Sequence, residues 1–434
     1  MIKDYVKQAW ELMKQNPLFS SLYVVGTALA ICFTTVMTVA YYVKIAPLYP
    51  EYNRNNTYYI TRLKLETVDN KNNINSAFSY NALRDLMYPL KNAEAVSGIF
   101  QEGNEHWVRP LTGNDFSVKL ISTDPGFFKI YEFDYIEGSS FSEADFESGV
   151  RTVVISDKLA QKTFHQTEGV VGKMLSLDMN DYRVCGVIRA GNKLGSYSYA
   201  DAYIPYKANP NYQATFYYDY IGFFEALFLV KDNEQKEALQ AELDAVIANV
   251  NQQHKDEWQL KPLTLRPHIT TVFYYLYLDN DYKLTPWILF KKFLPIILVL
   301  LLIPAFNLSG MISSRMEDRL AEMGVRKSFG ASKSALLSQV MWENLILTLA
   351  GGLVGLIIAW SILYLGKSWV FTLFDDYPDF LYDNSITITG EMLFTPVVFI
   401  TALLVCVIIN LLSALIPAWN SLRKPIVSSL NEKK

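Results

Sequence analysis

The sequence predicts a membrane protein with four transmembrane α-helices and a large extracytoplasmic α+β domain between spans 1 and 2. Two observations predict this fold class. Four stretches contain no Asp, Glu, Lys or Arg, at residues 15–43, 293–314, 344–366 and 392–422, and each exceeds the roughly 20 apolar residues that cross a bilayer. A charged block at residues 44–285 separates the first stretch from the other three. The net charge of −4 would also suit a soluble protein, but four such helices in one soluble chain are not expected.

The distribution of charge predicts on which side of the membrane each connection lies. Residues 1–17, 313–335 and 421–434 together carry twelve Lys or Arg and six Asp or Glu, whereas the rest of the chain carries 27 and 37. Short basic connections stay in the cytoplasm, so both termini are predicted to be cytoplasmic. The predicted order is a cytoplasmic amphipathic helix at 1–17, span 1 at 18–43, the outer domain at 44–285, span 2 at 286–312, a cytoplasmic connection at 313–335, span 3 at 336–366, a short outer loop at 367–391, span 4 at 392–420 and a cytoplasmic tail at 421–434.

The first residues and the overall composition narrow the range of partners. Apolar residues recur at helical spacing within residues 2–13, which predicts a helix in the plane of the inner leaflet, in contact with lipid, before an uncleaved span. An ordinary polar extension is the alternative. The acidic balance without a basic tract argues against nucleic-acid binding. Three cysteines and four histidines are scattered without metal-ligand spacing.

The outer domain has alternating and helical patterns that predict an α+β fold in two parts. Strands are predicted at residues 57–65, 95–100, 117–122, 151–155, 174–177, 182–188 and 225–230, and helices at 79–90 and 233–249. The sequence contains no Gly-x-Ser-x-Gly elbow, His-Glu-x-x-His pair or spaced cysteine cluster. Its acidic residues, such as Asp134, Glu137, Asp145 and Glu147, are expected to be solvated turn residues. We therefore predict no catalytic, cofactor-binding or metal site.

A segment of the outer domain resembles a known family. Residues 122–189 look like the extracytoplasmic core domain of the MacB and FtsX-type ABC transporter permeases. The matching positions are Asp124, Phe127, Phe128, Glu137, Gly138, Phe141, Asp145, residues 153–156, Ala160, Gly172 and residues 184–187. Each also has a local interpretation, since Gly138 and Gly172 suit turns that need positive φ and the alternating apolar residues suit one face of a sheet. These positions define a fold and no reaction.

The connection at 313–335 carries a tighter resemblance. Residues 307–355 are similar to the cytoplasmic elbow of the same permeases, and the matching residues are Arg319, Glu322, Gly324, Arg326, Lys327, Gly330, Ala331 and Ser332. The resemblance implies a coupling helix that docks on a nucleotide-binding ATPase subunit. From the residues alone, Gly330 is expected to end a short charged helix and Ser332 to cap the next one. A basic loop that only fixes the topology is the alternative.

Two features of span 3 stand out from its apolar background. Glu343 is a carboxylate within the predicted membrane segment, and such a residue is a functional-site hypothesis by default. We favour a structural tie to an Arg or Lys of the elbow over a proton or substrate relay. Gly351 and Gly355 have the spacing that lets helices approach closely. Packing within the chain and a seam between two chains are both open for this pair.

The sequence contains no convincing phosphate-binding loop, which needs Gly-x-x-x-x-Gly-Lys followed by Ser or Thr. Gly366-Lys367-Ser368 has Ser361 where the first glycine must stand, and Gly172-Lys173 is followed by Met174. In the three-domain exporters of the family, the ATPase precedes the first span on the same chain, whereas 17 residues precede it here. The resemblance therefore implies that ATP and Mg²⁺ bind a separate ATPase subunit and that this chain is not itself an enzyme.

The resemblance implies a permease subunit in the bacterial cytoplasmic (inner) membrane, paired with an identical or paralogous permease chain. It implies mechanotransmission, in which ATP hydrolysis moves the outer domain to export or extract a substrate, and it allows a periplasmic adaptor or an outer-membrane protein as a further partner. An FtsX-like signalling permease that regulates a cell-wall hydrolase is one alternative. A membrane-anchored sensor without an ATPase is another. A secondary transporter is disfavoured, because its substrate site should lie among broken helices within the membrane.

Overall fold

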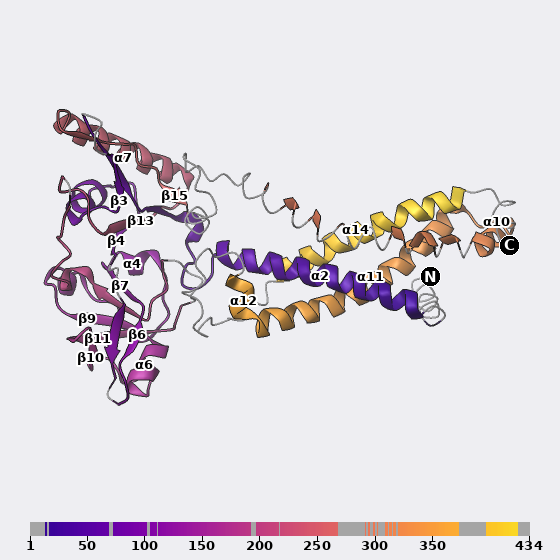
Figure 1. The fold of residues 1–434 in the computed structure, drawn as a ribbon, viewed down its shortest axis with the longest axis horizontal. Coiled ribbons are helices and arrows are strands. Elements are labelled where there is room, and N and C mark those ends of the chain that lie inside the picture. Colours follow the sequence, from indigo (N-terminus) through magenta and orange to yellow (C-terminus); the bar gives the residue numbers. More distant parts are fainter. Residues whose placement is uncertain are drawn as a thin grey trace. The chain divides into compact units, whose positions relative to one another are not determined.

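A computed structural model describes residues 14, 17–68, 73–101, 105–110, 112–191, 197–216, 218–267, 291, 294, 295, 298, 299, 302, 309, 310, 312–314, 316, 317, 320–372 and 396–423. The chain forms two compact units (Figure 1). One, the membrane unit, contains residues 1–43, 280–384 and 388–434. The other, the outer domain, contains residues 44–279 and 385–387.

The membrane unit is built from long apolar helices. Helices α2 (Pro17–Ile45), α11 (Lys333–Leu365) and α14 (Pro396–Arg423) are the three candidate spans within the described residues. They coincide with predicted spans 1, 3 and 4. Predicted span 2 lies largely outside the described residues, as do the predicted helix at 1–17, the outer loop beyond Thr372 and the tail beyond Arg423. Two shorter helices, α10 (Leu320–Ser328) and α12 (Lys367–Thr372), flank α11.

Small residues bring α2 and α14 close to α11. A Cβ atom added at Gly355 would lie 2.5 Å from the carbonyl oxygen of Ala28 in α2, and one at Gly351 would lie 2.8 Å from Thr27 Cβ. Gly352 faces Leu403 of α14 at 2.7 Å in the same sense. Figure 1 shows the three helices running alongside one another. The two glycines that were open between packing within the chain and a seam between chains therefore serve packing within the chain.

The outer domain has two sheets in the described part of the chain. The large sheet has the order β15-β1-β13-β4-β7-β12-β9-β11-β10-β5-β6, with β8 also paired to β11, and the small one has the order β14-β2-β3. The strands are β1 (Thr57–Ile60), β2 (Leu63–Thr67), β3 (Asn73–Ser76), β4 (Ala95–Phe100), β5 (His106–Arg109), β6 (Phe116–Val118), β7 (Leu120–Thr123), β8 (Tyr135–Gly138), β9 (Thr152–Ser156), β10 (Met174–Leu177), β11 (Asn180–Ile188), β12 (Ala202–Pro205), β13 (Phe224–Leu229), β14 (Trp258–Leu260) and β15 (Arg266–Pro267).

Helices and short helical turns cover these sheets. They are α3 (Tyr80–Ala82), α4 (Phe127–Ile130), α5 (Glu143–Glu147), α6 (Asp157–Phe164), α7 (Asn233–Gln253), the π-helical turn η2 (Leu83–Met87), and the 3₁₀ turns η1 (Arg54–Asn56) and η3 (Tyr206–Ala208). Helix α7 begins at Asp232, whose side chain accepts the Gln235 N–H at 2.9 Å. It buries Leu239, Leu243, Ile247 and Val250.

Two predicted strands are wrong as single elements. Residues 57–65 divide at Thr61–Arg62 into β1 and β2, which belong to different sheets. Residues 117–122 divide at Lys119 into β6, paired with β5, and β7, paired with β12. Neither break contains Gly or Pro, so alternation alone runs through it. The predicted helix at 79–90 is a capped turn followed by η2, whereas the strand predicted at 95–100 coincides with β4.

A buried carboxylate lies where β7 meets α4. Asp124 is 4% exposed, and its Oδ2 accepts the Gly98 N–H at 2.7 Å and the Tyr88 hydroxyl at 2.5 Å. Tyr88 also shares a 2.9 Å hydrogen bond with Tyr206. Desolvation raises the pKa of Asp124 to about 6, and the hydrogen bonds from Gly98 and Tyr88 offset this only in part. The carboxyl group thus ties β4 and η2 to the end of β7.

The raised pKa of Asp124 predicts that the stability of the folded chain depends on pH. Because the folded state binds this proton more tightly than the unfolded state, the stabilising contribution is complete below about pH 4 and is lost as the pH rises through about 6. The substitution Asp124→Asn keeps both hydrogen-bond acceptor roles and removes the titration. The free energy of unfolding of Asp124→Asn, measured relative to that of the native chain, is expected to rise between pH 4 and pH 7. The expected rise is about 3 kcal/mol, because the pKa of Asp124 lies about two units above its usual value. Amide exchange at Gly98 in the full chain measures this, and a difference that does not depend on pH would contradict the assignment.

Candidate functional site

The elbow between α10 and α11 has two defined helix ends. Gly330 has a φ of +91°, and its N–H donates to the Lys327 carbonyl at 3.0 Å. The Ala331 N–H donates to the Arg326 carbonyl, also at 3.0 Å. Glycine pays no Cβ penalty in this left-handed conformation, so α10 stops here. Two residues later, Ser332 caps α11 by accepting the Ala335 N–H at 3.2 Å. The helix end at Gly330 and the cap at Ser332 are as the sequence predicts.

A ladder of polar side chains connects α10 to α11. Arg326 Nη2 lies 2.6 Å from Glu322 Oε1 one turn earlier, and Arg326 Nη1 donates to Gln339 Oε1 at 2.7 Å. The Gln339 amide in turn donates to Glu343 Oε1 at 3.1 Å. Glu343 is 2% exposed, so its carboxylate depends on such partners. Gln339 thus links Glu343 to Arg326, whereas the sequence analysis favoured a tie of Glu343 to an Arg or Lys of the elbow.

Gln339 was missed by the sequence analysis, although one signal could have identified it. Gln339 and Glu343 are four residues apart, so they lie on the same face of α11 one turn apart. A glutamine can accept from a guanidinium and donate to a carboxylate at once. Gln339 and Glu343 thereby extend the hydrogen-bonded contact of Arg326 by one helical turn into the span.

Buried apolar contacts also hold α10 against α11. Met323 of α10 and Leu336 and Val340 of α11 are 4–5% exposed and belong to one buried cluster, against which Ala331 packs. Gly324 is also buried, whereas Ser332 is exposed. Partial burial lowers the pKa of Lys327, and the charge of Lys333 lowers it further. Arg319, the remaining predicted elbow residue, lies outside the described residues.

The elbow has two neighbouring exposed apolar residues that the sequence analysis did not single out. Phe329 is 87% exposed and Val325, one turn earlier, is 45% exposed. The Phe329 N–H donates to the Val325 carbonyl at 3.1 Å, so the two residues occupy one helical turn. Arg326 and Lys327 lie between them in the chain. Aromatic residues and arginine are enriched in protein–protein interfaces relative to the rest of a protein surface.

Deeper in the membrane unit, uncharged polar groups pair between helices. The Tyr23 hydroxyl of α2 shares a 3.1 Å hydrogen bond with Thr348 of α11, and Asn410 Nδ2 of α14 donates to Thr27 Oγ1 at 3.5 Å. All four side chains are at most 5% exposed. Polar pairs of this kind fasten membrane helices to one another. We therefore assign them to packing of the three helices.

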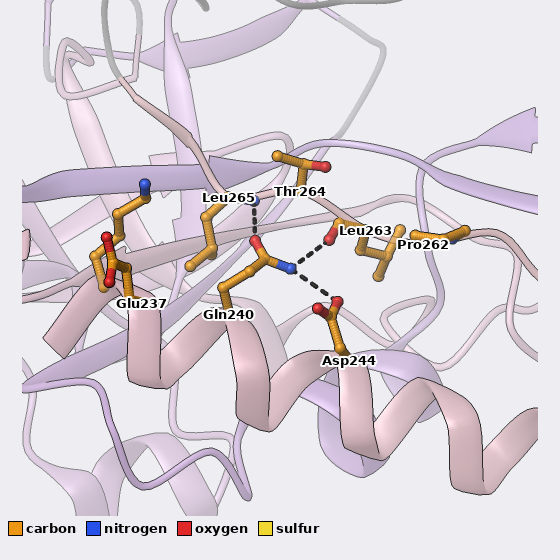
Figure 2. A pocket seen from close by; sticks show the side chains of 8 residues that line it. Glu237, Gln240, Asp244, Pro262, Leu263, Thr264 and Leu265 are labelled. Carbon is orange, nitrogen blue, oxygen red and sulfur yellow. Dashed lines mark hydrogen bonds between the residues drawn. The ribbon is translucent and has the colours of Figure 1, made fainter. Parts of the chain in front are cut away.

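The outer domain has a surface hollow of about 380 Å³ between α7 and residues 262–265 (Figure 2). Gln240 occupies it as a bridge, because its amide donates to the Leu263 carbonyl at 2.7 Å and to Asp244 at 2.9 Å. Its carbonyl oxygen accepts the Leu265 N–H at 3.0 Å. The Gln240 amide thus hydrogen-bonds with backbone groups of this segment, as a paired strand would, and attaches the segment to α7. Within the described residues, no group of three or more His, Cys, Asp or Glu is placed to hold a metal ion.

Two family models match this chain, and together they cover both units. The model of the MacB-like periplasmic core domain matches residues 20–246, and the model of the FtsX-like permease C-terminal region matches residues 295–426. The first match alone spans more than half of the chain. The chain belongs to the MacB/FtsX-like family of ABC transporter permeases. As a member of this family, it is a membrane permease with a large periplasmic α+β domain.

Two relatives are similar to this chain at low sequence identity. The uncharacterized ABC transporter permease YknZ of Bacillus subtilis is 22% identical over 65% of this chain and 65% of its own length. The macrolide export ATP-binding/permease protein MacB of Agrobacterium fabrum is 24% identical over 72% of this chain. This chain spans only 43% of that MacB protein.

Two solved structures are similar to about half of this chain. The extracellular domain of YknZ matches with 19% identity and a TM-score of 0.33, over 46% of this chain and 100% of that domain. The periplasmic region of MacB from Actinobacillus actinomycetemcomitans matches with 14% identity and a TM-score of 0.35, over 52% of this chain and 95% of that region.

Proposed function

We propose that this chain is the permease subunit of an ABC transporter that works by mechanotransmission. A separate ATPase subunit would bind the elbow on the cytoplasmic side, with both termini of the permease on that side. A second permease chain, identical or paralogous, would complete the assembly. ATP hydrolysis would then move the outer domain and drive export or extraction of a substrate from the periplasmic side. Relatives named as macrolide and pyoverdine exporters support the export role.

One observation carries this proposal: the elbow is fastened to α11 by the ladder Glu322–Arg326–Gln339–Glu343. A partner that pushes on α10 would therefore push on the span itself, because the two helices share hydrogen bonds and a buried apolar contact. The exposed Phe329 and the neighbouring basic side chains supply a surface for that partner. A loop that only fixed the topology would need neither the ladder nor an exposed aromatic residue.

Isolation of the tagged chain from native membranes in a mild detergent tests this proposal. We expect an ABC ATPase to co-purify in equal amount, and ATP hydrolysis by the complex to be inhibited by vanadate. Efflux from reconstituted vesicles would support export. A co-purifying cell-wall hydrolase without efflux would support the FtsX-like signalling alternative, and isolation without any ATPase would contradict both and favour a sensor.

A further inference from the structure

The chain enters the outer domain through residues 46–54, which follow directly on α2. Two charged residues of this segment are buried, since Arg54 is 5% exposed and Glu51 is 2% exposed. Arg54 Nε lies 2.5 Å from Glu51 Oε2. Removing such a pair from water costs several kcal/mol per ion, so a buried ion pair is weak evidence for a gain in stability. We therefore expect the Arg54–Glu51 pair to have a role in addition to stabilising the fold.

The guanidinium group of Arg54 also holds the end of α2. Its Nη1 donates to the Ala46 carbonyl at 2.5 Å, and Ala46 is the first residue after the helix. A guanidinium is a planar fork whose donors have fixed directions. Because Glu51 binds Nε and so fixes the orientation of the guanidinium group, Nη1 holds the Ala46 carbonyl in one place.

Glu51 extends this contact into the centre of the large sheet. Its second oxygen, Oε1, accepts a short hydrogen bond from the Ser198 hydroxyl. The Ser198 carbonyl accepts the Tyr203 hydroxyl at 2.6 Å, and Tyr203 lies on β12 between β7 and β9. Ser198 and Tyr203 are fully buried. A continuous buried network therefore runs from the end of α2 to a central strand.

A second anchor fixes the same segment from its other side. The Tyr49 ring lies 3.9 Å from the Arg189 guanidinium, and the Tyr49 hydroxyl donates to the Arg189 carbonyl at 2.7 Å. The same hydroxyl accepts the Asp134 N–H at 3.2 Å. The segment that follows α2 is thus attached both to β12 and to the end of β11.

We propose that Arg54, oriented by Glu51, is a positioning residue that transmits movement of α2 to β12. This inference rests on the proposed function, because it assumes that an ATPase moves the spans. Axial or rotational displacement of α2 would reach Ala46 first. The guanidinium group and the Glu51 carboxylate would then pass it to Ser198 and to the sheet, instead of losing it in the connecting segment.

Hydrogen exchange on the full chain with its ATPase in nanodiscs tests this, with and without ATP and vanadate. In the native complex we expect nucleotide to change exchange both in the elbow, residues 320–332, and in residues 197–205. The variant Arg54→Lys keeps a cation beside Glu51, but one ammonium group cannot reproduce the two-sided fork. We expect the elbow response to remain and the response of residues 197–205 to fall about threefold or more.

Two further variants separate this role from simple stabilisation. Ser198→Ala breaks only the outer step of the network and tests the proposal if Arg54→Lys folds poorly; it should also reduce the response of residues 197–205. Lys261→Met removes a 2.6 Å ion pair with Glu66 of the small sheet and should leave the response unchanged. A purely structural role would raise exchange equally with and without nucleotide.

An unchanged nucleotide response of residues 197–205 in both Arg54→Lys and Ser198→Ala would overturn the inference and leave the proposed function intact. No nucleotide response at the elbow of the native complex would overturn the proposed function, and the inference with it.

Discussion

The double substitution Arg326→Glu and Lys327→Glu is expected to reduce co-purification of the ATPase subunit by more than about tenfold. Reversing two charges turns any acidic partner surface from attractive to repulsive, and like charges facing each other across an interface cost several kcal/mol. About 1.4 kcal/mol already corresponds to a tenfold loss of affinity. The carboxylate introduced in place of Arg326 would also repel Glu322 one turn away, and the donor to Gln339 would be lost. Quantitative pull-down at two salt concentrations measures the effect.

The matched control reverses two lysines outside the elbow, Lys129→Glu and Lys255→Glu. Both residues are exposed in the outer domain, and the change in net charge is the same. We expect this variant to bind the ATPase like the native chain. Full association and transport by the elbow variant would exclude the elbow as the docking site. The single variant Arg326→Gln, which keeps a polar side chain without the charge, separates the loss of charge from the damage to α10.

The substitution Gly355→Leu is expected to destabilise the membrane unit strongly. The new Cβ would lie 2.5 Å from the Ala28 carbonyl oxygen and 3.0 Å from its Cα atom. Both are backbone atoms that cannot rotate away, so α2 must separate from α11. Overpacking of this kind costs about 1–3 kcal/mol, and separation would also strain the Tyr23–Thr348 hydrogen bond. The thermal stability of the detergent-solubilised chain and its elution as a single species measure the loss.

Gly310→Leu is the control for this substitution, because a Cβ atom at Gly310 meets no atom of the described residues within 4 Å. We expect its thermal stability to equal that of the native chain. If both variants behaved alike, the loss would come from glycine replacement in general, and the close approach of α2 and α11 would not be its cause.

The sequence predicted spans 1, 3 and 4 and the two helix ends at Gly330 and Ser332 because their signals are local. A bilayer-length apolar run defines α11 or α14 without reference to neighbours, and Gly330 and Ser332 mark helix ends by their own chemistry. The strand breaks at Thr61–Arg62 and Lys119 were missed because they depend on which sheet each half joins. Nothing in the alternation of apolar residues encodes that choice.

The polar networks were beyond sequence analysis for a different reason. Gln339 gains its role from Arg326, thirteen residues away, and Glu51 from Ser198, 147 residues away. Exposure is also a tertiary property, so Phe329 reads as an ordinary apolar residue until the elbow leaves it uncovered. Glu343 was recognised because a carboxylate within an apolar run is costly wherever its partners lie.

The pairing of β1 with β15 has a geometric consequence. Tyr58 and Tyr59 lie opposite Pro267 and Arg266, so the first and last strands of the outer domain meet at one margin of the large sheet. Ten strand spacings separate this margin from β6 at the opposite end of the large sheet. At roughly 4.8 Å per spacing, the far margin lies up to roughly 48 Å away. A rotation of the large sheet by about 10° about its β1–β15 margin would therefore displace the β5–β6 margin by up to roughly 8 Å.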